Sequence, residues 1–175
     1  GKSDEGAWSH AAWTTFFTDI EGELKPEPYF DTRLKMLWDE EFIYFYAEME
    51  EEHIWGDITE RDAVIFYNND FEIFIKPNDR LPVYAEFEVN ALGTLWDLLL
   101  MRPYRRNGPV FDGWDVNDTQ IGIDIRGTLN DPSDTDQGWS LEMAIPLAAL
   151  SALDRGSKVE TGTTWRINFS RVQWQ

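Results

Sequence analysis

The residues best suited to chemistry in this sequence are aromatic rings placed beside carboxylates and amides. The chain has nine tryptophans, which is more than the core of a 175-residue domain needs. The C–H faces of a sugar ring stack on indole, and its hydroxyl groups hydrogen-bond to nearby carboxylates and amides. We therefore expect some rings to lie on the surface and bind a carbohydrate. Aromatic residues set among polar ones are Trp55, Phe66, Tyr67, Trp96, Tyr104 and Trp114.

Carboxylates could also serve as the acid and base of a glycoside hydrolase. With 33 acidic residues in the chain, some pair at a suitable separation is expected by chance, so pairing alone does not indicate catalysis. The sequence contains no Gly-x-Ser-x-Gly elbow, phosphate-binding glycine loop or His-Glu-x-x-His motif. Binding without catalysis is the better interpretation, and a part of a glycoside hydrolase is the alternative.

Two acidic loops could hold a hard cation through oxygen ligands. Residues 130–136 combine turn formers with three carboxylates, those of Asp131, Asp134 and Asp136, and are a candidate calcium site. Residues 111–118 are a second candidate. A turn capped by Asn and Asp side chains, leading into the strand that starts at Trp139, explains the first loop equally simply.

These side chains are positioned by segments that alternate apolar and polar residues with a period of two, as strands do when one face is buried. In the clearest segment, residues 83–90, the polar face should present carboxylates and an amide to solvent or to a ligand. The apolar face consists of Val83, Ala85, Phe87 and Val89. The polar face consists of Tyr84, Glu86, Glu88 and Asn90.

Similar patterns recur along the chain and predict an all-β fold. Further strands are expected at residues 34–38, 42–49, 71–75, 121–125, 139–145 and 165–169. Residues 42–49 are apolar or aromatic at nearly every position, as in a central strand covered on both sides. Short helices are expected at residues 146–153 and 8–17. We predict one domain over residues 1–175, an antiparallel β-sandwich of jelly-roll type with one or two short helices.

The charge of the chain restricts its partners. The formal net charge of -18 argues strongly against ligands held through phosphates, such as nucleic acid or an anionic membrane, whereas it would attract a divalent cation. No apolar run reaches the roughly 18 residues that a membrane span needs. The chain has no cysteine, which leaves its compartment undecided. We expect a monomer.

Residues 61–75, Arg-Asp-Ala-Val-Ile-Phe-Tyr-Asn-Asn-Asp-Phe-Glu-Ile-Phe-Ile, resemble carbohydrate-binding module family 9. The resemblance extends over nearly the whole chain. It includes residues 32–44, 84–90, 94–97, 127–130, 138–146 and 165–171. The pairs Trp96-Asp97 and Asn130-Asp131 are typical of a divergent branch.

This resemblance implies an antiparallel sandwich that binds cellulose, xylan or a derived oligosaccharide without cleaving it, with a sugar held between two tryptophans and with structural calcium. Glu72 matches an acidic residue that helps to bind the sugar. Glu88 falls where the family can use an arginine. Phe66 falls near the first clamping tryptophan, for which Trp55 could substitute. The second clamping tryptophan is expected beyond Trp174, so either a C-terminal segment is absent from this domain or the sequence is truncated.

The ligand site predicted from the rings and the resemblance consists of Trp55, Phe66, Tyr67, Asn68, Glu72, Glu88, Asn90 and Trp96. The resemblance also implies a role in polysaccharide degradation and a location outside the cytoplasm of a bacterium, whether secreted, periplasmic or on the cell surface.

A haem-binding sandwich outside the cytoplasm is a further alternative, because similar sandwiches ligate iron through Met with His or Lys. The chain has only two histidines, and His53 follows three glutamates in what should be an exposed loop. The four methionines are better explained as core residues. They are Met36, Met49, Met101 and Met143.

Overall fold

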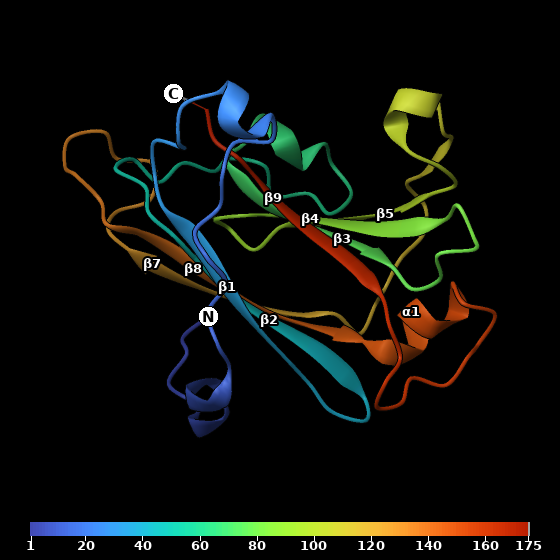
Figure 1. The fold of residues 1–175 in the computed structure, drawn as a ribbon. Coiled ribbons are helices and arrows are strands. Elements are labelled where there is room, and N and C mark those ends of the chain that lie inside the picture. Colours follow the sequence, from blue (N-terminus) through green and yellow to red (C-terminus); the bar gives the residue numbers. More distant parts are fainter. Residues whose placement is uncertain (175) are drawn as a thin grey trace.

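The computed structural model describes residues 1–174 and forms two antiparallel sheets packed face to face (Figure 1). The four-stranded sheet has the order β1-β2-β8-β7, with β1 Thr32–Trp38, β2 Phe42–Met49, β7 Gln120–Arg126 and β8 Gly138–Pro146. The five-stranded sheet has the order β6-β5-β4-β3-β9, with β3 Asp70–Lys76, β4 Tyr84–Asn90, β5 Leu95–Leu100, β6 Val110–Phe111 and β9 Arg166–Val172. The predicted β-sandwich is confirmed.

The core lies between the two sheets, where the apolar faces of the alternating strands meet. Phe71 on β3 and Phe87 on β4 face Phe45 on β2 and Trp139 on β8, and all four side chains are fully buried. Their alternation with polar residues leaves the other face of β3 and β4 free to carry polar groups. The core therefore fixes which side chains of the five-stranded sheet point outward.

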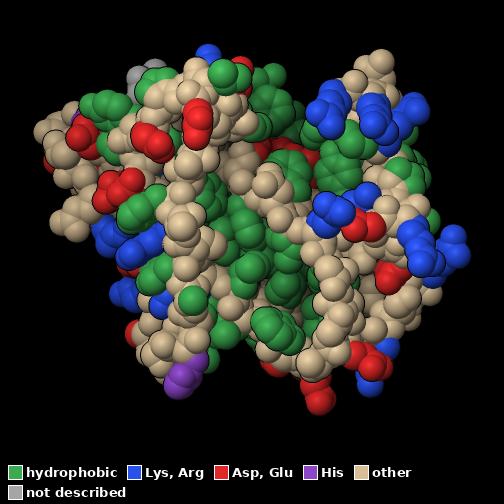
Figure 2. Space-filling model, viewed as in Figure 1, with side chains coloured by type: hydrophobic (Ala, Val, Ile, Leu, Met, Phe, Trp, Pro, Cys, Tyr) green, Lys and Arg blue, Asp and Glu red, His purple; other side chains and the backbone are tan. Residues whose placement is uncertain are grey.

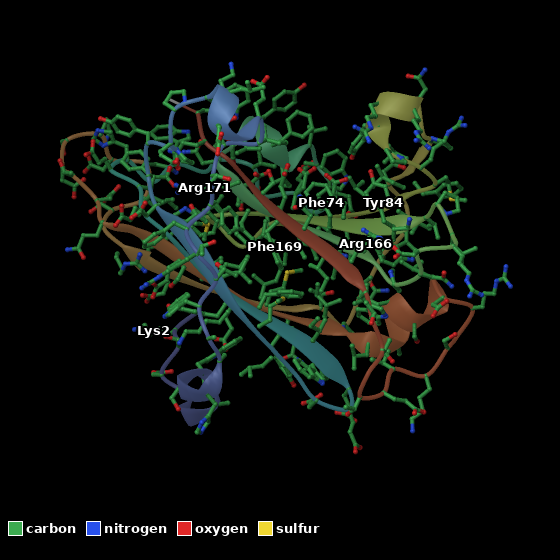
Figure 3. The ribbon with its side chains drawn as sticks, viewed as in Figure 1. Lys2, Phe74, Tyr84, Arg166, Phe169 and Arg171 are labelled. Carbon is green, nitrogen blue, oxygen red and sulfur yellow. The ribbon has the colours of Figure 1, made fainter. Side chains whose placement is uncertain are left out.

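A buried polar network joins the sheets at one end of the core. The guanidinium group of Arg171, on β9, donates to the Glu51 carboxylate at 3.1 Å, and the Trp139 indole N–H donates to the same oxygen at 2.9 Å. The side chain of Arg171, which comes from β9, is labelled in Figure 3. Because these groups are almost completely buried, their pairing connects β9 to the opposite sheet.

One of the two helices predicted from the sequence is present in the structure, and the other is not. The predicted helix at residues 146–153 is present as α1 (Leu147–Ala152), which starts directly after Pro146. The helix expected at residues 8–17 is wrong, because only a 3-10 turn, η1 (Gly6–His10), forms there. The backbone N–H groups of Thr14 and Phe17 instead donate to carbonyl oxygens of β1. Aromatic and Thr residues favour such extended backbone.

Three further 3-10 turns occur in loops, at η2 (Gly22–Leu24), η3 (Ile65–Tyr67) and η4 (Tyr104–Arg106). β5 was not predicted from the sequence, because Leu98 and Leu100 are buried on its outer face, so the segment shows no alternation. No helix within residues 1–174 combines the length and the apolar character that a membrane span requires.

Candidate functional site

Four carboxyl groups share the outer face of the five-stranded sheet, on the side of β3 and β4 that points away from the core. Asp70 and Glu72 are two residues apart on β3, and Glu86 and Glu88 are two residues apart on β4. Glu72 lies directly opposite Glu88 in the antiparallel ladder. We refer to Asp70, Glu72, Glu86 and Glu88 as the acidic cluster.

The acidic cluster is buried, with exposed fractions of 0% to 9%. The expectation that the polar face of β4 presents its carboxylates and Asn90 to solvent or to a ligand is therefore wrong for solvent, because Glu86, Glu88 and Asn90 are buried. The turns η3 and η4 supply partners for the cluster: the Phe66 N–H donates to Glu88 at 3.2 Å, and the Tyr104 hydroxyl donates to Glu86 at 2.7 Å. Figure 2 shows acidic atoms at the bottom of a recess bordered by hydrophobic side chains.

Burial, together with mutual repulsion, makes these carboxyl groups hold protons more tightly than usual. Burial is the main cause that raises the pKa of Glu88 to about 9, and the charges of Asp70, Glu86 and Glu72 add to it. Burial and the neighbouring Glu72 raise the pKa of Asp70 to about 8. Burial raises the pKa of Glu86 to about 7, and it also raises the pKa of Glu72. Ionising all four carboxyl groups of the acidic cluster is therefore unfavourable, because they are buried and repel one another.

Aromatic rings gather beside this cluster. The Phe66 ring lies 5.0 Å from the Tyr67 ring and 6.1 Å from the Trp96 ring, measured between centroids. Tyr67 is 70% exposed and Phe66 is 37% exposed. Trp96 lies opposite Glu88 on the outer face, and its buried indole N–H has no hydrogen-bond partner. These rings are the part of the predicted site that the fold brings together.

Trp174 joins these rings from the far end of the chain and was not among the predicted site residues. Its indole N–H donates to the Phe66 carbonyl oxygen at 2.8 Å, and its backbone N–H donates to the Asn69 side chain at 2.7 Å. The side chain is 59% exposed. We refer to Phe66, Tyr67, Trp96 and Trp174 as the aromatic surface.

Trp174 also borders a groove of about 960 Å³ between β9 and the N-terminal segment. Phe16 and Tyr29 line the groove and are exposed aromatic residues. Because the groove and the aromatic surface share Trp174, an extended ligand could contact both.

Other candidate rings lie elsewhere. Trp55 is exposed in the loop after β2, and within residues 1–174 its ring pairs with neither Phe66 nor Trp96. Trp114 packs edge-on against Phe87 in the core, with 5.9 Å between centroids. The fold therefore gives Trp55 no place among the gathered rings.

The two predicted amides have local partners. The Asn68 carbonyl oxygen accepts from the N–H groups of Asp57 and Ile58, at 3.0 and 3.1 Å. The Asn90 side chain donates to the Ile58 carbonyl oxygen at 2.8 Å and accepts from the Thr94 N–H at 3.0 Å. Their contacts position the loop before η3. A direct role in ligand binding stays a prediction for both.

The loop at residues 130–136 uses its carboxylates in hydrogen bonds. The two oxygens of Asp136 accept from the backbone N–H groups of Ile54 and Thr128, at 2.7 and 2.6 Å. Asp134 accepts from the Thr128 hydroxyl, and Asp131 accepts from the Ser133 N–H. These hydrogen bonds match the alternative of a turn capped by Asn and Asp side chains, and calcium there stays a prediction.

The residues considered for haem are placed without a common site. His10 and His53 are exposed, as expected for His53, and Met49 and Met143 are fully buried in the core. Met36 and Met101 are exposed, so the interpretation of all four methionines as core residues is wrong for these two. Nothing in this arrangement favours an iron site over core packing.

A family model described as "Carbohydrate family 9 binding domain-like" matches residues 1–98, which is more than half of the chain. The chain belongs to this family. The matched part includes η3, β3, β4 and most of β5, so it contains the acidic cluster and three of the four rings of the aromatic surface. No curated protein matches the chain.

Solved structures share the fold of this family 9 domain. A proposed carbohydrate-binding protein from Bacteroides uniformis is 16% identical, with a TM-score of 0.68 over 93% of this chain and 72% of that one. A family 9 module from Caldicellulosiruptor kristjanssonii in complex with cellotriose is 17% identical, with a TM-score of 0.60 over 97% and 68%. A structure of a family 9 module from Caldicellulosiruptor kristjanssonii in complex with glucose is 16% identical, with a TM-score of 0.62 over 97% of this chain and 70% of that one.

Proposed function

We propose that this domain binds a polysaccharide or oligosaccharide on the aromatic surface and does not cleave it. The observation that carries the proposal is the gathering of Phe66, Tyr67, Trp96 and Trp174 at one exposed place, from η3, β5 and the residues after β9. Exposed aromatic rings suit the apolar face of a pyranose.

Polar partners for the sugar hydroxyl groups are available next to the rings. Glu72 and Glu88 lie on the same outer face of the sheet as Trp96. Because the acidic cluster is buried, the sugar would lie over the rings and reach carboxylates only at the edge of the recess. The rings would supply most of the binding energy, and the polar groups would orient the sugar.

The substrate class we favour is a neutral plant polysaccharide such as cellulose or xylan, or an oligosaccharide derived from it. A net charge of -18 would repel acidic polymers and leaves neutral ones unaffected. The bound cellotriose and glucose in the structural relatives support this class. Such polymers lie outside the cell, so the proposal places the domain outside the cytoplasm of a bacterium, acting as a monomer. A glycoside hydrolase domain would perform any cleavage.

Isothermal titration calorimetry and affinity electrophoresis test the proposal. Cellulose- and xylan-derived oligosaccharides are titrated into the protein, and soluble xylan and cellulose derivatives are cast into native gels. We expect at least one of these ligands to bind or to retard migration. If no ligand binds, the proposal is wrong.

Reducing-sugar release separates binding from catalysis. We expect none when the protein is incubated with the same polymers. Release that disappears in the Glu88→Gln variant would instead assign the acidic cluster to a glycoside hydrolase.

A further inference from the structure

The acidic cluster has a geometry suited to a metal ion. One oxygen from each of Asp70, Glu72 and Glu88 lies within 4.8 Å of the other two. Calcium binds carboxylate oxygens at 2.3–2.6 Å, so two ligands on opposite sides of one ion are separated by about 5 Å. Three hard oxygen donors without sulfur or imidazole favour calcium or magnesium over zinc.

The charges of the cluster lack a cationic partner in the protein. Within residues 1–174, no Lys or Arg forms an ion pair with any of the four carboxyl groups. Buried carboxylates are normally paired with a cation or bound to a metal. A metal ion would supply the missing positive charge.

A second group of carboxylates in the protein has a cationic partner and can be compared with the acidic cluster. Asp62, Asp97 and Asp115 also bring oxygens within 4.8 Å of one another. There, the Arg61 guanidinium donates to Asp97 at 2.5 Å, and the other Asp97 oxygen accepts from the Val116 N–H at 2.6 Å. Arg61 forms ion pairs with all three of these carboxylates, so this group has a cationic partner within the protein, which the acidic cluster lacks.

Asp70 provides an independent observation. Its side chain is fully buried, and its Oδ2 atom has no hydrogen-bond partner, whereas its Oδ1 atom accepts from the Val172 N–H at 3.3 Å. Because Asp70 and Glu72 are two residues apart on β3, their carboxyl groups point into the same space. An unpartnered buried carboxylate oxygen is costly unless something binds it.

We propose that Asp70, Glu72 and Glu88 bind a hard divalent cation of the calcium class on the outer face of β3 and β4. Glu86 lies beside these ligands and increases the negative potential that attracts the ion. The ion removes the repulsion among the carboxyl groups and fixes β3 against β4 beneath the aromatic surface. Glu72 and Glu88 also border the proposed sugar site, but metal binding does not depend on sugar binding, and the test contains no sugar, so a failure of either proposal is distinguishable from a failure of the other.

Calorimetric titration of the metal-free protein tests the site. The full chain is stripped with a chelator, dialysed into roughly 0.15 M NaCl to screen weak surface binding, and titrated with CaCl2 and then with MgCl2. We expect calcium to bind and to raise the melting temperature. If neither ion binds at up to about 10 mM, beyond the weakest range of protein calcium sites, the proposal is wrong.

Substitutions test whether Asp70 and Glu88 bind the calcium ion. The double variant Asp70→Asn with Glu88→Gln keeps the side-chain shapes, and we expect its calcium affinity to fall by about tenfold or more. The matched controls Asp115→Asn, in the compensated group, and Asp134→Asn, in the 130–136 loop, should bind as the wild type does. Unchanged binding in the double variant, or its loss in Asp134→Asn, overturns the assignment.

A spectroscopic measurement covers the case in which the double variant does not fold. Terbium replaces calcium in the wild-type protein and emits when a nearby indole transfers energy to it. Trp96 lies opposite Glu88, so we expect the emission to fall strongly in Trp96→Phe and not in Trp38→Phe, which changes the opposite sheet. Equal emission from both variants overturns the proposal.

Discussion

Trp174 donates its indole N–H to the backbone carbonyl oxygen of Phe66 across 108 residues of sequence. The bond fixes an exposed indole beside the rings of η3 and β5, and a second bond from the Trp174 N–H to Asn69 holds the backbone there. The aromatic surface is therefore assembled from three separate segments, and each is anchored to the five-stranded sheet.

Removing the central ring should weaken sugar binding. Phe66 contacts both Tyr67 and Trp96, so Phe66→Ala removes a stacking surface and loosens its neighbours. We expect the affinity for the bound oligosaccharide to fall by about tenfold or more, measured by calorimetry. Trp38→Ala is the matched control, because Trp38 is 67% exposed on the other sheet. Equal affinities in both variants would contradict the site.

The buried pair of Glu51 and Arg171 should contribute strongly to stability. Arg171→Ala leaves the Glu51 carboxylate buried without its cation, so we expect the free energy of unfolding to fall by about 3–5 kcal/mol, measured by urea denaturation. The exposed pair of Lys158 and Glu160 is the control, and Glu160→Gln should leave stability unchanged. A small loss in Arg171→Ala would show that the network is not needed to join the sheets.

The metal-free protein should lose stability as the pH rises. The pKa of Glu88 is raised to about 9, that of Asp70 to about 8 and that of Glu86 to about 7, while the same groups ionise near pH 4 when unfolded. A carboxyl group whose pKa is higher in the folded than in the unfolded protein stabilises the folded state. This stabilisation is complete below the pKa of the unfolded state, and it is lost as the pH rises through the pKa of the folded state. The free energy of unfolding should thus fall between about pH 4 and 9.

Urea denaturation in the presence of a chelator measures this dependence. Glu88→Gln removes the group with the highest of these pKa values and lessens the repulsion on Asp70, Glu72 and Glu86, so its curve should fall less steeply with pH. Tyr104, which donates to Glu86 and faces the same cluster, remains in place. Parallel curves for the variant and the wild type would show that the cluster does not control the pH dependence.

Asp136 should stabilise the fold as a hydrogen-bond acceptor. Asp136→Ala leaves the N–H groups of Ile54 and Thr128 without their partner, so we expect the free energy of unfolding to fall by about 2 kcal/mol or more. Asp131→Ala, which changes an exposed turn in the same loop, should have a much smaller effect. The opposite order would indicate that the loop has another role, such as binding calcium.

Much of the fold could be predicted, because apolar residues recur at every second position in most of its strands. Phe71, Ile73 and Ile75 recur at every second position, so they identify β3 and its buried face without any knowledge of the rest of the chain. β5 could not be found in this way, because Leu98 and Leu100 are buried on its outer face, so apolar residues occupy both of its faces. The extended course after Trp13 depends on pairing with β1, which a local pattern does not reveal.

The candidate site was only partly predictable. The alternation that buries Phe87 also places Glu88 on the outer face, and Glu72 follows by the same rule. The burial of these carboxylates could not be read from the sequence, because it depends on how η3 and η4 fold back over the sheet. Trp174 was missed for the same reason, since only the folded chain places it beside Phe66.

The most direct test of the account is to observe the indole N–H groups by NMR while an oligosaccharide is added. Each of the nine tryptophans gives its own indole signal, so the spectrum locates the ligand on the protein. Assignment by single Trp→Phe substitutions identifies Trp96, Trp174 and the control Trp38. Addition of cellotriose or a xylan-derived oligosaccharide should shift the signals of Trp96 and Trp174 and leave that of Trp38 unchanged. Shifts confined to Trp38 or Trp55, or no shift with any oligosaccharide, would contradict binding at the aromatic surface.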